Sequence, residues 1–420
     1  MSATLSPTTP PPESTAQSAV ETVRAEYAAS PRVRPFEREL AGLSEADREA
    51  WSAAARDGAD LRQTPEYAAM HLARPDVPRL PGLWISPNEA CGRRAVLLPK
   101  RLNLPKPLSW VRRELRGYWM AGNGAVAGAG AGPSTGDDLG ELLAECGRAV
   151  RRQGGDFLLI EDLELDTPLK DAAYGLLREG WRAHSTTGWQ PRWRIRFPET
   201  ADEYWAKFNS KRRGNLRRQQ RQFGGTVVRV ETVEQVDWFL EKAAEVSKTT
   251  WQTRVLGQRV SGDEFERRCH ELAARTGSLR SYVLMKDDKP ASFAIGLQYG
   301  GRFSLEEIGY DPIHAEWSPG MVLLCHILDD LYAERTPAEF DFGGGDAPYK
   351  RTLANHESVG GTVWLIAPGW SRRVTLGALG GGVKIRAWGR RMAKEWAARR
   401  TGGRTEVVSK GGTESRREEG

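Results

Sequence analysis

The chain has 420 residues, which is enough for two domains with hydrophobic cores of their own. A hydrophobic content of 39% and 15 tryptophans exclude a disordered protein, and the apolar runs are too short for a helix that crosses a bilayer. The net charge of +6 is unevenly placed: residues 371–420 hold 13 Lys and Arg against 5 Glu, and residues 207–221 hold seven Lys and Arg and no acid. Two basic segments indicate anionic partners more strongly than a uniformly basic surface would.

Residues 1–35 are rich in Pro, Ser and Thr and lack the apolar stretch of a secretion signal, so we expect a disordered leader. Residues 36–192 are predicted to form a first α/β domain, because helical and strand patterns alternate there. The expected elements are helices within 36–73, two strands at 81–100, helices at 138–152 and 169–179, and a strand at Phe157–Ile160. A Gly- and Ala-rich loop at 121–136 interrupts them.

Residues 193–368 are predicted to form a second α/β domain. Its expected elements are a strand at Arg194–Phe197, a basic helix at Thr200–Phe223, a strand at Thr226–Val230, helices at Val233–Thr249 and Asp263–Thr276, and strands at Ser281–Lys286, Ser292–Tyr299 and Arg302–Tyr310. The turn residues from Asp287 to Pro290 indicate a hairpin between two of these strands. The two domains share a rough order of elements, which favours a tandem pair, although no clear sequence repeat links them.

Residues 369–420 are predicted to be a basic tail that is partly disordered. Within it, apolar residues recur among many cations, a pattern typical of an amphipathic helix on an anionic membrane surface. A basic tail without a partner is the alternative. The apolar residues are Val383, Ile385, Trp388, Met392 and Trp396.

The four cysteines are scattered and never at metal-ligand spacing, so we expect no metal and no disulfide framework. Free thiols of this kind fit a reducing cytoplasm, and the basic tail allows a position on the inner face of the membrane.

The stretch 302–357 carries the most chemical information. Ser318, Pro319 and Gly320 open a helix, whose N-terminal N–H groups and dipole attract phosphate; Ser318 suits the cap and Gly320 permits close approach of a ligand. A short strand at Phe340–Phe342 runs into three glycines, at the kind of strand end where sheets bind ligands. Plainer interpretations stay open: a helix start without a ligand, and a turn with solvated charges.

These residues resemble a known family. The segments GYDP, SPG and FDFGGGDAPYK are similar to the GNAT-type acyltransferase domain of CelD-like bacterial proteins, which are relatives of Fem-type aminoacyltransferases. The likeness runs from roughly Arg194 to Pro368 and, more weakly, back to Trp51. Its most specific part, D-F-G-x-G-D-x-x-Y-K, is met by Asp341, Phe342, Gly343, Gly345, Asp346, Tyr349 and Lys350.

The resemblance implies a GNAT fold, with two tandem GNAT-like domains, and an acyl donor, acetyl-CoA or another acyl-CoA. The donor site it implies consists of Ser318, Gly320, Met321, Gly343, Gly345 and Lys350. The chain departs from the usual pyrophosphate loop, because the segment from Glu316 to Gly320 is shorter and contains a proline. Fewer backbone donors then face the phosphates.

Acyl transfer needs a base for the nucleophile and donors for the oxyanion. Glu306 and Glu307 are consecutive on a predicted strand and so face opposite sides; one of them is the candidate base, and His314 is the competitor. In Fem-type relatives the lysine matching Lys350 lies in the acyl-donor site, so here it is expected to neutralise a phosphate or the oxyanion. Tyr349 is the candidate proton donor to the leaving thiolate. Asp341 and Asp346 are candidates to orient Lys350 or bind the acceptor, with Asp341 grouped with the catalytic residues and Asp346 with the substrate-binding residues.

The basic helix places Arg213 and Arg217 among other cations beside an aromatic set that can bury. They are candidates for binding an anionic substrate, the alternative being a solvated basic face.

The sequence as a whole therefore predicts transfer of an acyl group from acyl-CoA to an amine or hydroxyl. The acceptor, a small molecule or glycan of the cell-envelope or polysaccharide type, follows from the context of the resembling family. One alternative is a Fem-type aminoacyltransferase that uses aminoacyl-tRNA, with the basic helix as its RNA contact. Another is a GNAT-fold binding module without catalysis.

Overall fold

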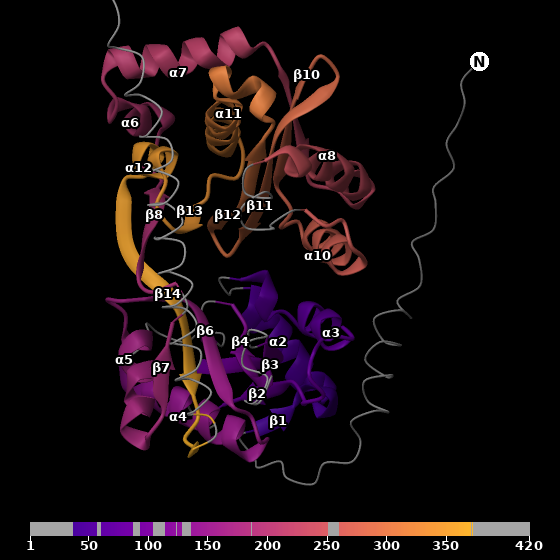
Figure 1. Cartoon of the computed structure of the whole chain (residues 1–420), viewed down its shortest axis with the longest axis vertical. Helices are drawn as coiled ribbons and strands as arrows, with labels where there is room; N and C mark the ends of the chain where they lie inside the picture. Colours follow the sequence, from indigo (N-terminus) through magenta and orange to yellow (C-terminus); the bar gives the residue numbers. More distant parts are fainter. Residues whose placement is uncertain are drawn as a thin grey trace, which may run out of the picture. The chain divides into compact units, whose positions relative to one another are not determined.

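The structure is a computed structural model of the chain (Figure 1). It describes residues 37–56, 60–86, 93–103, 114–122, 124–127, 136–185, 187–250, 260–370 and 372. The predicted leader and nearly all of the predicted basic tail lie outside these residues, so the amphipathic pattern at 383–396 is not described. The chain divides into two compact units; the first holds the described residues up to Arg101 and from Arg116 to Ala367, and all the predicted site residues belong to it.

The described residues up to 185 are called the first half below. Its elements are β1 (Glu37–Glu39), α2 (Glu45–Arg56), α3 (Pro65–Leu72), β2 (Leu83–Ile85), β3 (Arg93–Asn103), β4 (Glu114–Met120), β5 (Val126–Ala127), α4 (Gly136–Arg152), β6 (Phe157–Glu164), α5 (Pro168–Gly175) and β7 (Arg182–His184). Helix α3 begins where a cap residue meets a proline: the Thr64 hydroxyl accepts the N–H of Tyr67, and Pro65 takes the first helical position. The alternation of helices and strands predicted for this half is confirmed.

The described residues from 187 to 367 are called the second half. Its elements are β8 (Gln190–Arg196), α6 (Ala201–Ala206), α7 (Ser210–Phe223), β9 (Thr226–Val230), α8 (Val236–Thr249), α10 (Glu264–Arg275), β10 (Ser281–Lys286), β11 (Lys289–Tyr299), β12 (Arg302–Tyr310), the short helix η6 (Pro312–Trp317), α11 (Pro319–Ala333), β13 (Glu339–Gly344), α12 (Pro348–Leu353) and β14 (His356–Ile366). The predicted hairpin between β10 and β11 is confirmed; Asp287 and Asp288 both adopt positive φ, as a tight hairpin turn requires.

One prediction for this half is wrong in detail. The basic helix expected at Thr200–Phe223 is two helices, α6 and α7, because the chain turns at Lys207–Asn209. Asn209 starts the second helix by accepting the N–H of Arg212 at 2.8 Å, and the Lys207 amine donates to the carbonyl oxygens of Leu353 and Ala354. These contacts with the end of α12 stabilise the turn between α6 and α7, although the sequence pattern predicts one continuous helix.

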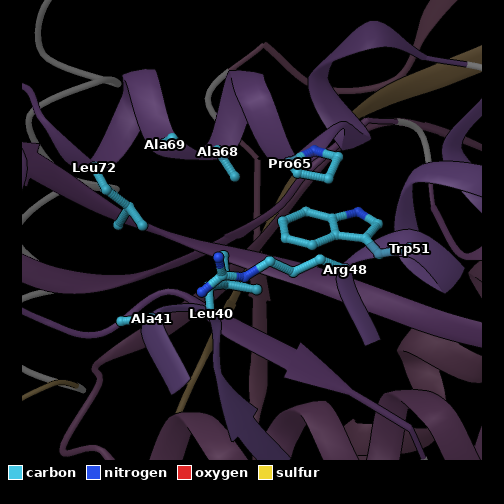
Figure 2. Close-up of a pocket in the computed structure, with 8 residues that line it drawn as sticks. All are labelled: Leu40, Ala41, Arg48, Trp51, Pro65, Ala68, Ala69 and Leu72. Atoms are coloured by element: carbon cyan, nitrogen blue, oxygen red, sulfur yellow. The ribbon is translucent and has the colours of Figure 1, made fainter. Parts of the chain in front are cut away.

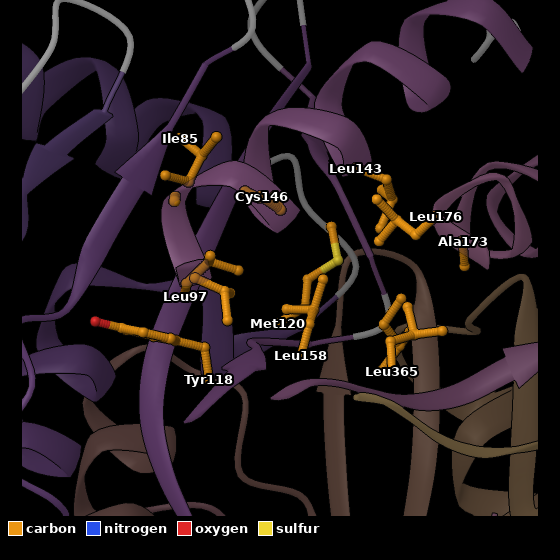
Figure 3. Close-up of a cluster of buried hydrophobic side chains, with 14 of the residues drawn as sticks. Ile85, Leu97, Tyr118, Met120, Leu143, Cys146, Leu158, Ala173, Leu176 and Leu365 are labelled. Carbon is orange, nitrogen blue, oxygen red and sulfur yellow. The ribbon is translucent and has the colours of Figure 1, made fainter. Parts of the chain in front are cut away.

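One sheet joins the two halves, with the strand order β1-β2-β3-β4-β6-β14-β8-β13-β12-β11-β10-β9. Strand β14 makes the connection: its first residues pair with β8, and its later residues, from Gly360 to Ile366, pair with β6 (Figure 1). Its side chains reach the core of the first half, where Leu365 lies near Leu158 and Met120 (Figure 3). The end of the second half therefore completes the core of the first.

A second hydrophobic contact also joins the halves. Leu61, which precedes α3, is buried in a cluster with Phe239, Val283 and Phe293 of the second half. This contact fixes the position of the residues beside Leu61.

The described part of the chain contains no helix long and apolar enough to cross a membrane. Cys146 and Cys325 lie buried on α4 and α11, and burial raises the pKa of the Cys325 thiol to about 12. Both thiols are therefore uncharged packing groups.

Candidate functional site

The parallel strands β12 and β13 pair for only three residues. Arg302–Ser304 lies against Glu339–Asp341, after which β12 continues to Tyr310 and β13 to Gly344 without pairing to each other. Beyond this point the facing edges of the two strands offer main-chain N–H and C=O groups to a ligand. Because the strands are parallel, the separation lies at their carboxyl ends, where α/β sheets bind ligands.

Helix α11 begins beside the end of β12. A Cβ added to Gly320 would lie 3.7 Å from Tyr310 Cδ1 and 3.9 Å from Ile308 Cδ1, which places the first turn of α11 against this strand. The structure thus brings Ser318, Gly320 and Met321 together at the point where β12 and β13 have separated.

The predicted side-chain cap of this helix is wrong. Ser318 has φ 51° and ψ 56°, a left-handed conformation that a non-glycine residue rarely adopts, and its hydroxyl makes no capping hydrogen bond. Its carbonyl instead accepts the N–H groups of Met321 at 2.9 Å and Val322 at 3.1 Å. Since Pro319 has no N–H, the first turn offers few backbone donors to a phosphate.

The glycine run at the end of β13 wraps around Lys350. The buried Lys350 amine donates to the carbonyl oxygens of Gly344 at 2.8 Å and Gly343 at 3.4 Å. Gly343 and Gly345 have φ of 68° and 87°, which favour glycine at both positions. Burial lowers the pKa of Lys350, and nearby Asp341 opposes that shift. The Lys350 amine therefore stabilises the conformation of the glycine turn and places a cation directly beside it.

Asp341 is buried and fully engaged. One carboxylate oxygen accepts from Arg192 Nη2 at 2.9 Å and Arg194 Nε at 3.2 Å, and the other accepts the Gly343 N–H at 2.7 Å. Burial alone would raise the pKa of Asp341, but the two guanidinium groups and the backbone N–H lower it below its usual range. A carboxylate held ionised in this way suits the positioning of the glycine turn better than proton transfer.

Glu306 occupies a β-bulge. Glu307 lies opposite Ile295 and Leu305 lies opposite Gly296, which leaves Glu306 as the extra residue on β12, two positions beyond the last pair with β13. Bulges redirect side chains next to active sites. The Glu306 carboxylate is 3.8 Å from the guanidinium of Arg62, a residue of the first half.

The surroundings of Glu306 favour its neutral form. Its side chain keeps 36% exposure. Burial by the surrounding protein nevertheless raises its pKa, Arg62 lowers it, and Asp60 raises it further. Glu306 is therefore an accessible carboxyl that binds its proton more tightly than an ordinary glutamate, as a general base requires.

Glu307 lies in surroundings that differ from those of Glu306, and the bulge at Glu306 interrupts the alternation on which the prediction of opposite faces rested. Burial raises the pKa of Glu307, and the charge of Glu266 on α10 raises it further. His314 lies on η6 with its ring 5.9 Å from that of Phe223. The charge of Asp341 contributes to the raised pKa of Glu306, which links Glu306 electrostatically to the glycine turn.

Tyr349 and Asp346 lie at the edge of this region. The Tyr349 ring packs edge-on against Phe342 at 6.0 Å, and burial raises the pKa of its hydroxyl to about 12, so the group stays protonated. Asp346 pairs with Arg351 near the surface, and that hydrogen bond lowers its pKa. Arg213 and Arg217 lie on α7, which is far from the glycine turn along the chain.

Sequence reasoning missed the ionic network around Asp341. Arg192 pairs with Asp162 and Arg194 pairs with Glu164, both on β6, while Arg62 pairs with Asp60 at 2.8 Å. The spacing of Arg192 and Arg194 could have predicted this network. The two residues are two apart and so lie on one face of a strand, and buried arginines on one face require acidic partners nearby. The network contains five carboxylates and four cations. The carboxylates are Asp60, Asp162, Glu164, Glu306 and Asp341, and the cations are Arg62, Arg192, Arg194 and Lys350.

A separate pocket lies in the first half between the chain near Leu40 and helices α2 and α3 (Figure 2). Its lining is mostly apolar, with Arg48 and Trp51 reaching across it. None of its lining residues belongs to the ionic network or to the predicted site.

Comparison with known proteins bears on the fold. Residues 210–351 match the model of an acetyltransferase (GNAT) domain, and no curated protein matches the sequence. The crystal structure of FemX superposes with a TM-score of 0.55 at 14% sequence identity, over 79% of this chain and 97% of that chain. The C-terminal domain of a putative lysylphosphatidylglycerol synthetase from Agrobacterium fabrum gives a TM-score of 0.48 at 13% identity, over 80% of this chain and 96% of that chain.

A tandem GNAT protein from the clavulanic acid biosynthesis pathway gives a TM-score of 0.40 at 11% identity, over 80% of this chain and 98% of that chain. The narrower likeness to CelD-like proteins stays a prediction. The expected α/β GNAT fold is confirmed, and the match to the acetyltransferase (GNAT) domain model, at residues 210–351, lies within the second half of the chain.

Proposed function

We propose that the protein transfers an acyl group from acyl-CoA to an amine or hydroxyl, with the reaction at the separation of β12 and β13. The observation that carries this proposal is the position of Glu306, an accessible carboxyl on a bulge with a raised pKa, two residues beyond the last β12–β13 pair. A proton acceptor there stands beside unpaired strand edges, which suit the two amides of the pantetheine arm of CoA.

In this proposal Glu306 accepts the proton of the attacking amine or hydroxyl. The nucleophile forms a bond to the thioester carbonyl carbon, and the resulting oxyanion collapses with loss of the CoA thiolate. Tyr349, whose hydroxyl stays protonated, is the proposed proton donor to that thiolate. Lys350, on α12, supplies positive charge near the oxyanion, and Asp341 with Gly343 and Gly345 holds the turn whose carbonyl oxygens Lys350 contacts.

The donor end is proposed to lie at Ser318, Gly320 and Met321, at the N-terminus of α11. Asp346 is proposed to contact the acceptor at the edge of the site. The acceptor class, a small molecule or glycan of the cell-envelope or polysaccharide type, comes from the likeness to CelD-like proteins.

Two observations favour a second candidate, an aminoacyltransferase that takes its donor from charged tRNA. The first turn of α11 has few donors for a pyrophosphate, and the cations of α7, Arg213 and Arg217 among them, suit an RNA backbone.

A thermal-shift panel separates the candidates. A ligand that binds only the native state at about 100 times its Kd stabilises it by roughly 2.7 kcal/mol. The proposal predicts a higher melting temperature with acetyl-CoA, longer acyl-CoAs or free CoA, and a smaller shift for Lys350→Ala. Stabilisation by charged tRNA alone, with a steep salt dependence, supports the second candidate. No stabilisation by either ligand contradicts both and leaves a non-catalytic module.

A further inference from the structure

The segment from Tyr310 to Trp317 exposes large apolar side chains to water. Six large hydrophobic residues of the described chain are more than a third exposed, and three of them lie in these eight residues. Ile313 is 76% exposed, Trp317 37% and Tyr310 36%. Such clustering marks an interaction surface, whereas single exposed hydrophobics are ordinary.

Helix α7 presents cations and no acid. Its sequence, SKRRGNLRRQQRQF, buries Leu216 and Phe223 against the core and leaves the basic side chains outward. The exposed cations are Lys211, Arg212, Arg217, Arg218 and Arg221. A helix with buried apolar residues and an exposed side that carries cations and no acid attracts an anionic surface.

The two features are in contact. Phe223, the last residue of α7, lies 5.9 Å from the His314 ring of η6, and α7 packs across α11, which follows η6 in the chain (Figure 1). Lys286 adds a further cation at this junction by donating to the Phe223 carbonyl oxygen. The apolar segment and the basic helix therefore adjoin each other, and we call the two together the η6–α7 surface.

We propose that the η6–α7 surface docks on an anionic lipid bilayer. Tyr and Trp favour the headgroup level of a membrane, and an aliphatic tip with neighbouring cations is the combination that binds anionic lipid at the interface. Ile313, the most exposed of the three, has no ring to stack on a base, which favours lipid over nucleic acid. Glu316 is the one acid in the segment 310–317 besides Asp311, and both are outnumbered by the cations of α7.

This surface lies next to the N-terminus of α11 and is independent of the proposed acyl transfer. It differs from the predicted amphipathic tail, because all its residues lie between 210 and 317. An enzyme docked here would meet acceptors that are themselves held at a membrane.

The test is co-sedimentation of the full chain with vesicles, which requires no catalytic activity. One set contains phosphatidylcholine alone and the other an equal mixture of phosphatidylcholine and phosphatidylglycerol. We expect binding to the anionic vesicles that falls about tenfold or more for Ile313→Ser and about fivefold for each cation removed in Arg218→Ser and Arg221→Ser. The matched control is Trp189→Ser, which removes an aromatic residue that is 38% exposed and lies outside this surface. It should bind as the wild type does.

The other outcomes overturn the proposal. Equal binding by wild type and Ile313→Ser would show that the apolar segment takes no part in docking. Wild-type protein that stays in the supernatant with anionic vesicles would show that the protein does not dock at all. Retention on tRNA that depends on Arg218 and Arg221 but not on Ile313, without vesicle binding, would assign the surface to RNA. Heat protection by long-chain acyl-CoA that Ile313→Ser abolishes, again without vesicle binding, would assign the segment to an acyl chain.

Discussion

Replacing Asp341 with Asn tests whether the buried ionic network holds the glycine turn. The substitution keeps the shape of the side chain and an oxygen for the Gly343 N–H, and it removes one negative charge between Arg192 and Arg194. Leaving a buried charge without its partner costs about 3–5 kcal/mol. Arg192 keeps Asp162 and Arg194 keeps Glu164, so we expect the lower end, a loss of about 3 kcal/mol in the free energy of unfolding.

The assay is urea unfolding followed by tryptophan fluorescence, with calorimetry as a second measurement. At about 2 °C per kcal/mol for a unit of this size, Asp341→Asn should melt about 6 °C below the wild type. The matched control is Asp346→Asn, at the other end of the glycine run, whose partner Arg351 is largely exposed. A surface pair of this kind is worth at most about 1 kcal/mol.

The direction of the Asp341 pKa shift determines how the free energy of unfolding depends on pH. Because the folded pKa is lowered, the carboxylate stabilises the fold above its unfolded pKa of about 3.9, and this contribution is lost as pH falls through the folded value. The difference in stability between wild type and Asp341→Asn should therefore be full near neutral pH and shrink below about pH 4. Equal unfolding free energies for Asp341→Asn and Asp346→Asn near neutral pH would refute the account of the network.

Three further predictions concern the site. Glu306→Gln should lower kcat by about two to four orders of magnitude and remove the acid limb of the pH–rate profile. In the wild type the midpoint of that limb should lie above the ordinary glutamate pKa, because burial raises the pKa of Glu306. An unchanged rate would exclude Glu306 as the base. Arg62→Met should move that acid limb to higher pH, since the guanidinium lowers the pKa of Glu306, and Arg62→Lys should partly restore it; identical profiles would separate Arg62 from catalysis. Ser318→Gly should raise the free energy of unfolding by up to about 1 kcal/mol, measured by urea unfolding, because glycine adopts the left-handed conformation without strain; a loss of stability would contradict this origin of the strain.

The local parts of the site were predictable from the sequence. Asp341, the glycine run and Lys350 lie within ten residues, so a strand followed by a turn brings them together whatever the rest of the chain does. The hairpin at Asp287–Asp288 and the strand at Arg302–Tyr310 followed from turn residues and alternation in the same way.

The long-range parts were not predictable. Arg192 and Arg194 meet Asp341 across 149 and 147 residues of chain, and the contact depends on β8 lying next to β13 in the sheet. Arg62 lies close to Glu306 because Leu61 is buried among residues of the second half. The hydrophobic pattern of the sequence does not predict this burial. The bulge at Glu306 is a change of register between two strands, and alternation along a single strand does not reveal it.

The most direct test of the proposed donor site is calorimetric titration of acetyl-CoA into wild type and Gly320→Ala. The added Cβ would make only ordinary contacts, at 3.7 Å and 3.9 Å, so the variant should be at least as stable as the wild type while its methyl group blocks the approach of the donor to the first turn of α11. The account predicts that the wild type binds acetyl-CoA and that Gly320→Ala, unfolding at the same or a higher temperature, binds at least about tenfold more weakly, a difference of about 1.4 kcal/mol. Equal affinity in the two proteins, or no binding to the wild type, would contradict it.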